Sequence, residues 1–351
     1  MDAYKEETDS RNKAAIDAIV SGLPLYVRRF AGEYLVIRNK SPRTVLGYVG
    51  DIRSFFRYLS DVHGVPIDEI SCRFLDSLTA DDLQDYLVYM LEYEDDLSGT
   101  PEKPKKRKNG ASARARKLSS IKALYNYLLS RKLIENNVPA SLVAPKPDQK
   151  DVVYLDKEEV RSVMYGAETG SSLTRSQDRY SKKQRLRDIA ILTLLLNTGL
   201  RVSELVGIDV TDIDWKEKKI KVRRKGGKEQ GIYFNDAVEE ALLDYIENER
   251  RTDTDDEKAL FISRMKQRIT VRSVERLVKK YTQNVVTSKT ITPHKLRSTF
   301  ATTLYGDTES GAGGDIYIVA DALGHSSLET VKKYTNISDD RRRKAGSSIR
   351  Y

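Results

Sequence analysis

Residues 186–205 read LRDIAILTLLLNTGLRVSEL. Apolar side chains recur at helical spacing up to Asn197, which predicts a buried helix. Gly199 then provides a natural stop, because glycine adopts a left-handed conformation without steric cost. Arg201 follows at the start of a second short segment, where free backbone N–H groups favour an anion. Taken alone, Arg201 is more simply explained as a surface charge, with Glu204 three positions on as a group that could orient its guanidinium.

Length and composition limit the class of protein. With 351 residues, 39% of them hydrophobic and 32% charged, the chain has enough material for two globular domains. It has no stretch of about 18 apolar residues that would cross a membrane, and its polar start lacks the features of a secretory signal. Cys72 is the only cysteine. We expect it in the core, without an internal disulfide, as in a cytoplasmic protein.

The chain carries a net charge of +9. Such a surplus favours a polyanionic partner, most often nucleic acid, although ordinary solubility also explains it. The densest basic run lies in residues 103–117, with Pro101, Pro104 and Gly110 around it, so we expect a flexible basic loop that contacts phosphates without reading sequence. The residues expected to contact double-stranded DNA are Arg43, Lys105, Lys106, Arg107, Arg114, Arg116, Lys117 and Lys228.

The first part of the chain, residues 22–144, is predicted to be helical. Ser41 and Pro42 start one helix, as N-cap and first helical residue. Thr79 starts a second helix, and a third follows the basic loop. Their apolar stripes are most simply a hydrophobic core.

A linker separates this part from a second domain. Residues 145–151 contain two prolines and no apolar periodicity, which is typical of a linker. Residues 152–351 form the second domain, in which residues 170–183 and 306–314 are expected to be surface loops.

Residues 219–234 of the second domain follow the pattern of a β-hairpin. Polar and apolar side chains alternate on both sides of Gly226 and Gly227, which predicts two strands around a tight turn. Lys225 lies at the tip. Its ammonium is either a solvated charge or a proton donor that a mobile tip delivers into a DNA groove.

A histidine and an arginine share the start of a later helix. Thr292 and Pro293 open this helix, and His294 and Arg297 lie three residues apart on one face of it. The N-terminal end of a helix carries partial positive charge. Imidazole, guanidinium and helix dipole would therefore converge on one phosphate, while a structural hydrogen-bonding role for His294 is equally open.

The last motif joins a histidine to a tyrosine. Gly324 ends a predicted helix and His325 follows it directly. Residues 326–329 read SSLE, a capping-box pattern that starts another helix, and Tyr334 lies at its end. A tyrosine hydroxyl beside imidazole and cationic donors is a candidate nucleophile for a phosphodiester. The chain holds 20 tyrosines, so only the position relative to His325 singles this one out.

Together these motifs resemble those of the tyrosine site-specific recombinases, which include phage and transposon integrases and the Xer recombinases. The resemblance covers residues from about 25 to 340. It rests on five motifs in family order, which are TGLRVSEL at 198–205, KGGKE at 225–229, HKLR at 294–297, LGHSS at 323–327, and Tyr334.

The resemblance implies a fold and an architecture. We expect a mainly α fold with a small β-sheet or hairpin in the catalytic domain, residues 152–351, and a helical core-DNA-binding domain, residues 22–144. The two domains would form a C-shaped clamp on DNA. A homotetramer would join two DNA sites, with accessory proteins as possible further partners.

It also implies a mechanism. Tyr334 would attack the scissile phosphate and form a 3′-phosphotyrosyl ester, and a Holliday junction would follow. His294 would act as base or proton relay, because a tyrosine hydroxyl has a pKa near 10. Lys225 would protonate the leaving 5′-oxygen.

The remaining motif residues would surround the phosphate. Arg201 and Arg297 would hold its nonbridging oxygens, His325 would donate a further hydrogen bond, and Glu204 would hold the arginines. The chemistry needs no cofactor and no metal, because the bond energy is kept in the ester.

Three other functions remain open on sequence alone. A type IB topoisomerase shares the phosphotyrosine chemistry, a DNA-binding protein would regulate without cutting, and a structural protein would carry its charge incidentally. Within the resembling family, the sequence does not choose between a cellular Xer-type enzyme and the integrase of a mobile element. We expect a cytoplasmic enzyme that associates with the nucleoid when it binds DNA.

Overall fold

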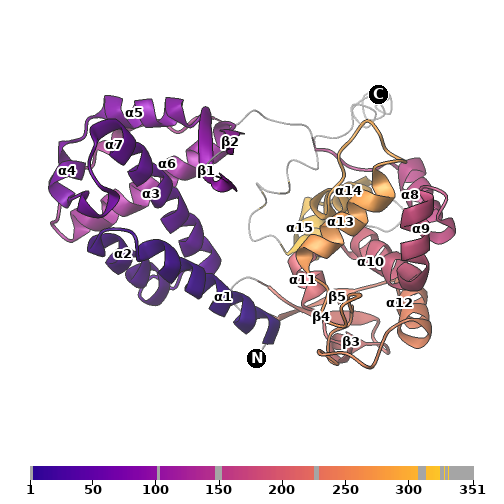
Figure 1. Ribbon diagram of the computed structural model, residues 1–351. Coiled ribbons are helices and arrows are strands. Elements are labelled where there is room, and N and C mark those ends of the chain that lie inside the picture. The colour runs from indigo at the N-terminus through magenta and orange to yellow at the C-terminus, as the bar shows by residue number, and fades with distance from the viewer. Residues whose placement is uncertain are drawn as a thin grey trace, which may run out of the picture. The chain divides into compact units, whose positions relative to one another are not determined.

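The computed structural model describes residues 3–100, 103–146, 152–224, 229–306, 314–324, 328 and 331 (Figure 1). For residues 94–100 and 103–107 it describes the backbone. The chain divides into two compact units, residues 1–150 and 151–351. The described residues contain no helix that is both long and apolar enough to span a membrane.

The first unit is mostly helical. Its elements are α1 (Ala3–Val20), α2 (Leu25–Val36), α3 (Pro42–His63), η1 (Ile67–Glu69), α4 (Cys72–Ser77), α5 (Ala80–Tyr89), β1 (Glu92–Thr100), β2 (Lys103–Lys108), α6 (Ala111–Ser130) and α7 (Val138–Ser141). The central helix α3 packs against α1 and α6. Aromatic side chains fill the core between these helices, among them Phe30, Phe55, Phe56, Tyr86 and Tyr125.

The predicted helix starts in this unit are confirmed. The hydroxyl of Ser41 accepts a hydrogen bond from the backbone N–H of Thr44 at 3.2 Å, and Pro42 is the first residue of α3. Thr79 and Asp82 form a reciprocal capping box at the start of α5. These caps satisfy backbone N–H groups that have no partner within the helix.

The prediction of a flexible basic loop is wrong in part. Residues 103–108 form strand β2, which pairs antiparallel with β1. Position 92 lies opposite 108, 94 opposite 106 and 95 opposite 105, so acidic residues of β1 face basic residues of β2. Opposite charges across a strand pair stabilise it. The basic run therefore belongs to a hairpin with an acidic partner strand.

Several helices are present that apolar periodicity did not predict, among them one at the start of the chain and one in a predicted loop. Helix α1 precedes the predicted helical part, and its apolar residues Ile16 and Val20 are buried in the core only near its end. Helix α9 (Arg175–Ser181) lies within the predicted loop 170–183, so that prediction is wrong. Thr174 and Gln177 form a capping box at its start, which shows that a polar segment can begin a helix through its caps.

The second unit surrounds one apolar helix, α10. Its helices are α8 (Lys157–Thr169), α9, η2 (Lys182–Gln184), α10 (Arg185–Thr198), α11 (Val202–Val206), η3 (Val210–Asp212), α12 (Asp236–Asn248), α13 (Val271–Thr282), α14 (Pro293–Gly306) and α15 (Ile316–Leu323). Helix α10 packs against α8, α12, α13 and α14. Its residues Ala190, Ile191, Leu192 and Leu194 are fully buried, so the helix is apolar on nearly all sides, as a central helix must be.

A three-stranded antiparallel sheet lies at one end of this unit (Figure 1). Strands β4 (Lys219–Arg223) and β5 (Glu229–Tyr233) form the predicted hairpin, and β3 (Ile213–Asp214) adds a short third strand. Ile220 and Val222 point into the core. The mainly α fold with a small sheet is therefore confirmed, while the arrangement of the units as a clamp stays a prediction.

Candidate active site

The turn after α10 places the first arginine of the site. Gly199 caps α10 with φ of 61°, the left-handed conformation that the sequence predicts. A Cβ at this position would overlap the ring of Phe300 on α14. Glycine is thus required for conformation and for space, and the sharp turn puts Arg201 directly before α11.

Glu204 holds Arg201 in two ways. One carboxylate oxygen accepts a hydrogen bond from Nη1 of Arg201 at 2.6 Å, and the other accepts from its backbone N–H at 2.8 Å. The side chain of Glu204 is 5% exposed and that of Arg201 is 38% exposed. The buried carboxylate therefore orients a guanidinium that still reaches the surface, which fits the binding of an anionic ligand.

Arg297 connects two helix ends to this turn. Its side chain is almost fully buried on α14, and its guanidinium donates hydrogen bonds to the carbonyl oxygens of Gly199 and Leu323. Both carbonyls belong to C-terminal ends of helices, where partial negative charge stabilises a cation. Arg201 and Arg297 thus meet at one turn, although 96 positions separate them in the sequence.

His294 lies one helical turn before Arg297. Helix α14 begins at Pro293, as predicted, and His294 is exposed at this end. The carbonyl oxygen of His294 accepts a hydrogen bond from the hydroxyl of Ser298 at 3.1 Å. The structure therefore places His294 and Arg297 on successive turns of one helix end, as the spacing of the motif indicates.

Four predicted residues lie outside the described part of the chain, namely Lys225, Lys228, His325 and Tyr334. The predicted capping box at 326–329 falls there in part. The described residues next to two of them do meet, because the Arg224 side chain donates from Nη2 to the carbonyl oxygen of Ala322 at 3.4 Å. Gly324 caps α15 with φ of 59°, as predicted. The segments that lead into Lys225 and His325 therefore start side by side.

Arg224 is a residue of this site that sequence reasoning missed. Its Nε lies 4.0 Å from the carboxylate of Glu204, and its side chain is 9% exposed. The strand alternation contained the signal, because Ile220, Val222 and Arg224 fall on the same face. An arginine on the buried face of a strand needs a specific role, since arginine is rarely buried without one.

The predicted DNA contacts divide by exposure. Arg43 is exposed in the first turn of α3, and Arg116 is 56% exposed on α6 while it bonds Asp51. Lys117 differs, because it is buried and donates to Asp51 and to Ser54. Its ammonium is thus held inside the unit and is not offered to a phosphate.

The remaining contacts predicted in this unit fall into two groups. Arg114 is half-buried on α6. Lys105, Lys106 and Arg107 lie on strand β2, where the structure describes the backbone. The hairpin thus carries these three residues on an ordered strand instead of a loop.

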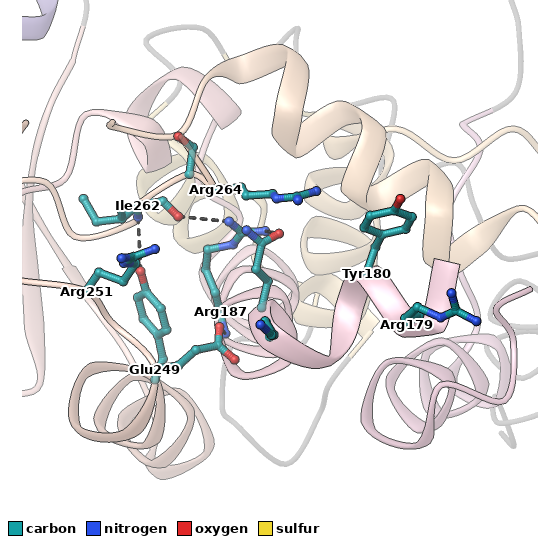
Figure 2. A pocket seen from close by; sticks show the side chains of 11 residues that line it. Arg179, Tyr180, Arg187, Glu249, Arg251, Ile262 and Arg264 are labelled. Atoms are coloured by element: carbon teal, nitrogen blue, oxygen red, sulfur yellow. Dashed lines mark hydrogen bonds between the residues drawn. The ribbon is translucent and has the colours of Figure 1, made fainter. Parts of the chain in front are cut away.

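A cavity of about 430 Å³ lies at the opposite end of α10 (Figure 2). Arg187 lines it and donates to the carbonyl oxygen of Ile262 at 2.9 Å, and it pairs with Asp188, whose carboxylate also pairs with Lys280. Arg251 is likewise paired with Asp253. This basic cavity lies about 20 Å from Arg201, because α10 rises about 1.5 Å per residue over its length. The described residues contain no cluster of three His, Cys, Asp or Glu side chains placed to bind a metal ion.

Comparisons with known proteins agree with this geometry. Residues 154–341 match the model of the phage integrase family, and residues 27–132 match its N-terminal SAM-like domain. The tyrosine recombinase XerC of Caldanaerobacter subterraneus subsp. tengcongensis is 35% identical over 92% of this chain and 86% of its own length. The tyrosine recombinase XerS of Streptococcus agalactiae is 30% identical over 94% of this chain and 96% of its own.

A solved structure shares the fold. The Tn1549 transposon integrase in complex with circular intermediate DNA is 21% identical and has a TM-score of 0.64, over 93% of this chain and 100% of that chain. The alternatives of a type IB topoisomerase and a non-catalytic DNA-binding protein are not favoured. The chain belongs to the phage integrase family, and it is a tyrosine recombinase.

Proposed function

We propose that this recombinase cuts and rejoins double-stranded DNA at two sites through a 3′-phosphotyrosyl ester on Tyr334. The observation that carries the proposal is the pair Arg201 and Arg297, which come from different elements and are held at the turn of Gly199. Two fixed guanidinium groups suit the nonbridging oxygens of one phosphate, whose negative charge grows in the transition state.

The chemical step conserves bonds and protons. The Tyr334 oxygen attacks phosphorus and passes its proton to His294, so that a P–O bond to tyrosine forms. The bond from phosphorus to the 5′-oxygen breaks, and that oxygen takes a proton from Lys225. The 5′-hydroxyl of a partner strand then attacks the ester and reverses the step, which first yields a Holliday junction.

The remaining groups surround the phosphate. His325 donates a hydrogen bond to it, and Glu204 holds Arg201 in place. The two arginines supply the charge stabilisation that a metal ion supplies in many nucleases. No nucleotide cofactor is needed, because the ester conserves the energy of the broken bond.

The proposed assembly is a homotetramer on two DNA sites, in which both units of each protomer contact one half-site. Exposed cations of the first unit, Arg43 and Arg116, contact backbone phosphates, and Lys105, Lys106 and Arg107 on β2 extend this surface. Accessory proteins that bend DNA or set direction are compatible with this assembly. Integration, excision and the resolution of joined molecules all use the same chemistry.

The test uses a nicked suicide duplex. A binding site is first selected from random duplexes, and the scissile position is then followed by a nick, so that the cleaved end diffuses away. The wild-type protein is expected to form a covalent protein–DNA adduct that survives denaturation. The Tyr334→Phe protein is expected to bind the duplex equally well and form none. An adduct on the Tyr334→Phe protein would overturn the proposal.

A further inference from the structure

Arg224 directly follows strand β4 and precedes Lys225. Strand alternation turns it inward with Ile220 and Val222. Its neighbour Arg223 lies on the opposite face and pairs with Glu229 across the hairpin. The two adjacent arginines therefore occupy different environments, one internal and one on the surface.

The guanidinium of Arg224 reaches the end of α15. Nη2 donates to the carbonyl oxygen of Ala322, and Nε faces the carboxylate of Glu204 at 4.0 Å. Its Nε and Nη1 are buried and have no hydrogen-bond partner among the described residues. The charged groups around it are Glu204, Arg201 and Asp321, and burial is the largest cause that lowers its pKa. Such a costly placement needs a compensating role.

Gly324 leaves the space that Arg224 fills. A Cβ at position 324 would overlap Nη1 of Arg224. Gly324 also has φ of 59°, so both conformation and space exclude other side chains. Gln230 on strand β5 makes a second link to the same helix, from Nε2 to the carbonyl oxygen of Asp321 at 3.3 Å. Both strands of the hairpin thus dock on the end of α15.

We propose that Arg224 is a positioning residue, which holds the chain directly before Lys225 against the end of α15 directly before His325. This inference rests on the proposed function. Arg224 directly precedes the KGGKE motif, contacts Gly324 of the LGHSS motif and faces Glu204 of the TGLRVSEL motif. One guanidinium therefore connects three motifs. Its loss is expected to remove this anchor, so that the proton of Lys225 reaches the leaving oxygen less often.

The leaving group isolates this effect. In a duplex with sulfur in place of the bridging 5′-oxygen, the leaving thiolate needs no proton, because a thiol has a pKa of about 8.5. With ordinary DNA, Arg224→Ala and Lys225→Ala are expected to slow adduct formation at least about 100-fold, the usual share of a general acid. With the sulfur duplex, both variants are expected to form the adduct at a rate within about tenfold of the wild-type rate. Arg201→Ala is expected to stay slow on both duplexes.

Two further variants keep the test independent of folding. Arg224→Lys retains the charge without the fork of donors, and it is expected to show the same rescue by sulfur as Arg224→Ala. Arg223→Ala is the matched control on the other face, and it is expected to cleave both duplexes like the wild type. Thermal melting of each protein establishes that it is folded.

Two outcomes overturn the inference. One is an Arg224→Ala protein that cleaves ordinary DNA at the wild-type rate. The other is a rate loss that is equal on both duplexes, which would mean a general structural defect or direct phosphate binding. The proposed function fails separately, if the Tyr334→Phe protein forms the adduct. A failure of the positioning role therefore leaves the nucleophile untouched.

Discussion

Arg116 and Lys117 are neighbours in the sequence and both bond Asp51, yet their exposure differs. The side chain of Arg116 is 56% exposed and that of Lys117 is 8% exposed. Asp51 is buried and also accepts a hydrogen bond from the hydroxyl of Ser120. The carboxylate thus compensates an internal ammonium while it orients an arginine that reaches solvent. Adjacent basic residues therefore lie in different environments, one inside the unit and one at its surface.

This difference predicts opposite phenotypes for the two positions. Arg116→Gln is expected to reduce the slope of log affinity for DNA against log salt by about 1, because one phosphate contact is lost. Lys117→Met is expected to leave this slope unchanged and to lower the free energy of unfolding by about 2 kcal/mol, since a charged hydrogen bond is lost. Salt titration of binding and urea denaturation measure the two effects. A reduced salt slope for Lys117→Met would contradict the internal role.

Among the helices, α10 is both the centre of the second unit's core and the element that ends at its active-site turn. One end holds Gly199 and leads to Arg201. At the other end, the carboxylate of Glu249 accepts hydrogen bonds from the backbone N–H groups of Leu186 and Arg187, at 3.0 and 3.1 Å. A residue from α12's end thus caps α10 from a distance, as N-cap side chains do locally.

The turn at Gly199 gives the first prediction at this scale. Gly199→Ala is expected to lower the free energy of unfolding by at least about 2 kcal/mol, from the strained backbone and the overlap with Phe300. It is also expected to slow adduct formation, because Arg201 shifts. In the double variant Gly199→Ala with Phe300→Ala the overlap is gone. Its loss of unfolding free energy is therefore expected to be about 1 kcal/mol smaller than the sum of the losses in the two single variants. Strict additivity would argue against the steric contact.

The cap at Glu249 predicts a dependence on pH. Burial raises the pKa of Glu249 above its ordinary value of 4.5. Between the ordinary pKa of the unfolded state and the raised pKa of the folded state, the folded state binds more protons than the unfolded state. The free energy of unfolding therefore falls as pH rises through this range. Glu249→Gln, which cannot ionise, is expected to lack this part of the slope. Urea denaturation between about pH 4 and pH 8 measures it, and identical slopes would contradict the prediction.

Removing the cap itself has a different effect. Glu249→Ala leaves the N–H groups of Leu186 and Arg187 without their acceptor. It is expected to lower the free energy of unfolding by about 1–2 kcal/mol at every pH in this range. The comparison with Glu249→Gln separates the loss of the hydrogen bonds from the loss of the charge.

At the scale of the whole molecule, the chain consists of two units with separate cores. The core of the first unit is rich in aromatic residues, whereas the second surrounds the aliphatic helix α10. Matches to two family models fall on the two units, at residues 27–132 and 154–341. The chemistry proposed for Tyr334 belongs to the second unit, and most of the DNA contacts predicted from the sequence belong to the first.

Tetramer assembly is expected to depend on the last residues of the chain. The tail after Tyr334 is proposed to dock on a neighbouring subunit and so to set which protomers are active. Deletion from Asp340 onward is expected to weaken the tetramer on paired sites and to leave binding to a single site unchanged. Gel mobility with one-site and two-site duplexes, together with analytical ultracentrifugation, distinguishes the species. Unchanged tetramer assembly would refute the role of the tail.

Local signals predicted much of the fold. Caps at Ser41 and Thr79 and glycine stops at Gly199 and Gly324 depend on hydrogen bonds and φ angles within a few residues, so they are legible in the sequence. The order of the motifs likewise indicated the family before any contact was known. The capping box at Thr174 was equally local, and it was missed because the helix after it lacks apolar periodicity.

Which charges face each other depends on how the chain folds. Strand β2 needs the acidic strand β1, Lys117 needs Asp51 from another helix, and Arg224 needs the space above Gly324. Each of these is a contact between distant positions, and its energy depends on burial and on counter-charges that appear only when the chain is folded. A basic residue in a sequence is therefore a candidate for DNA binding, catalysis or internal pairing alike, and its folded surroundings select one of them.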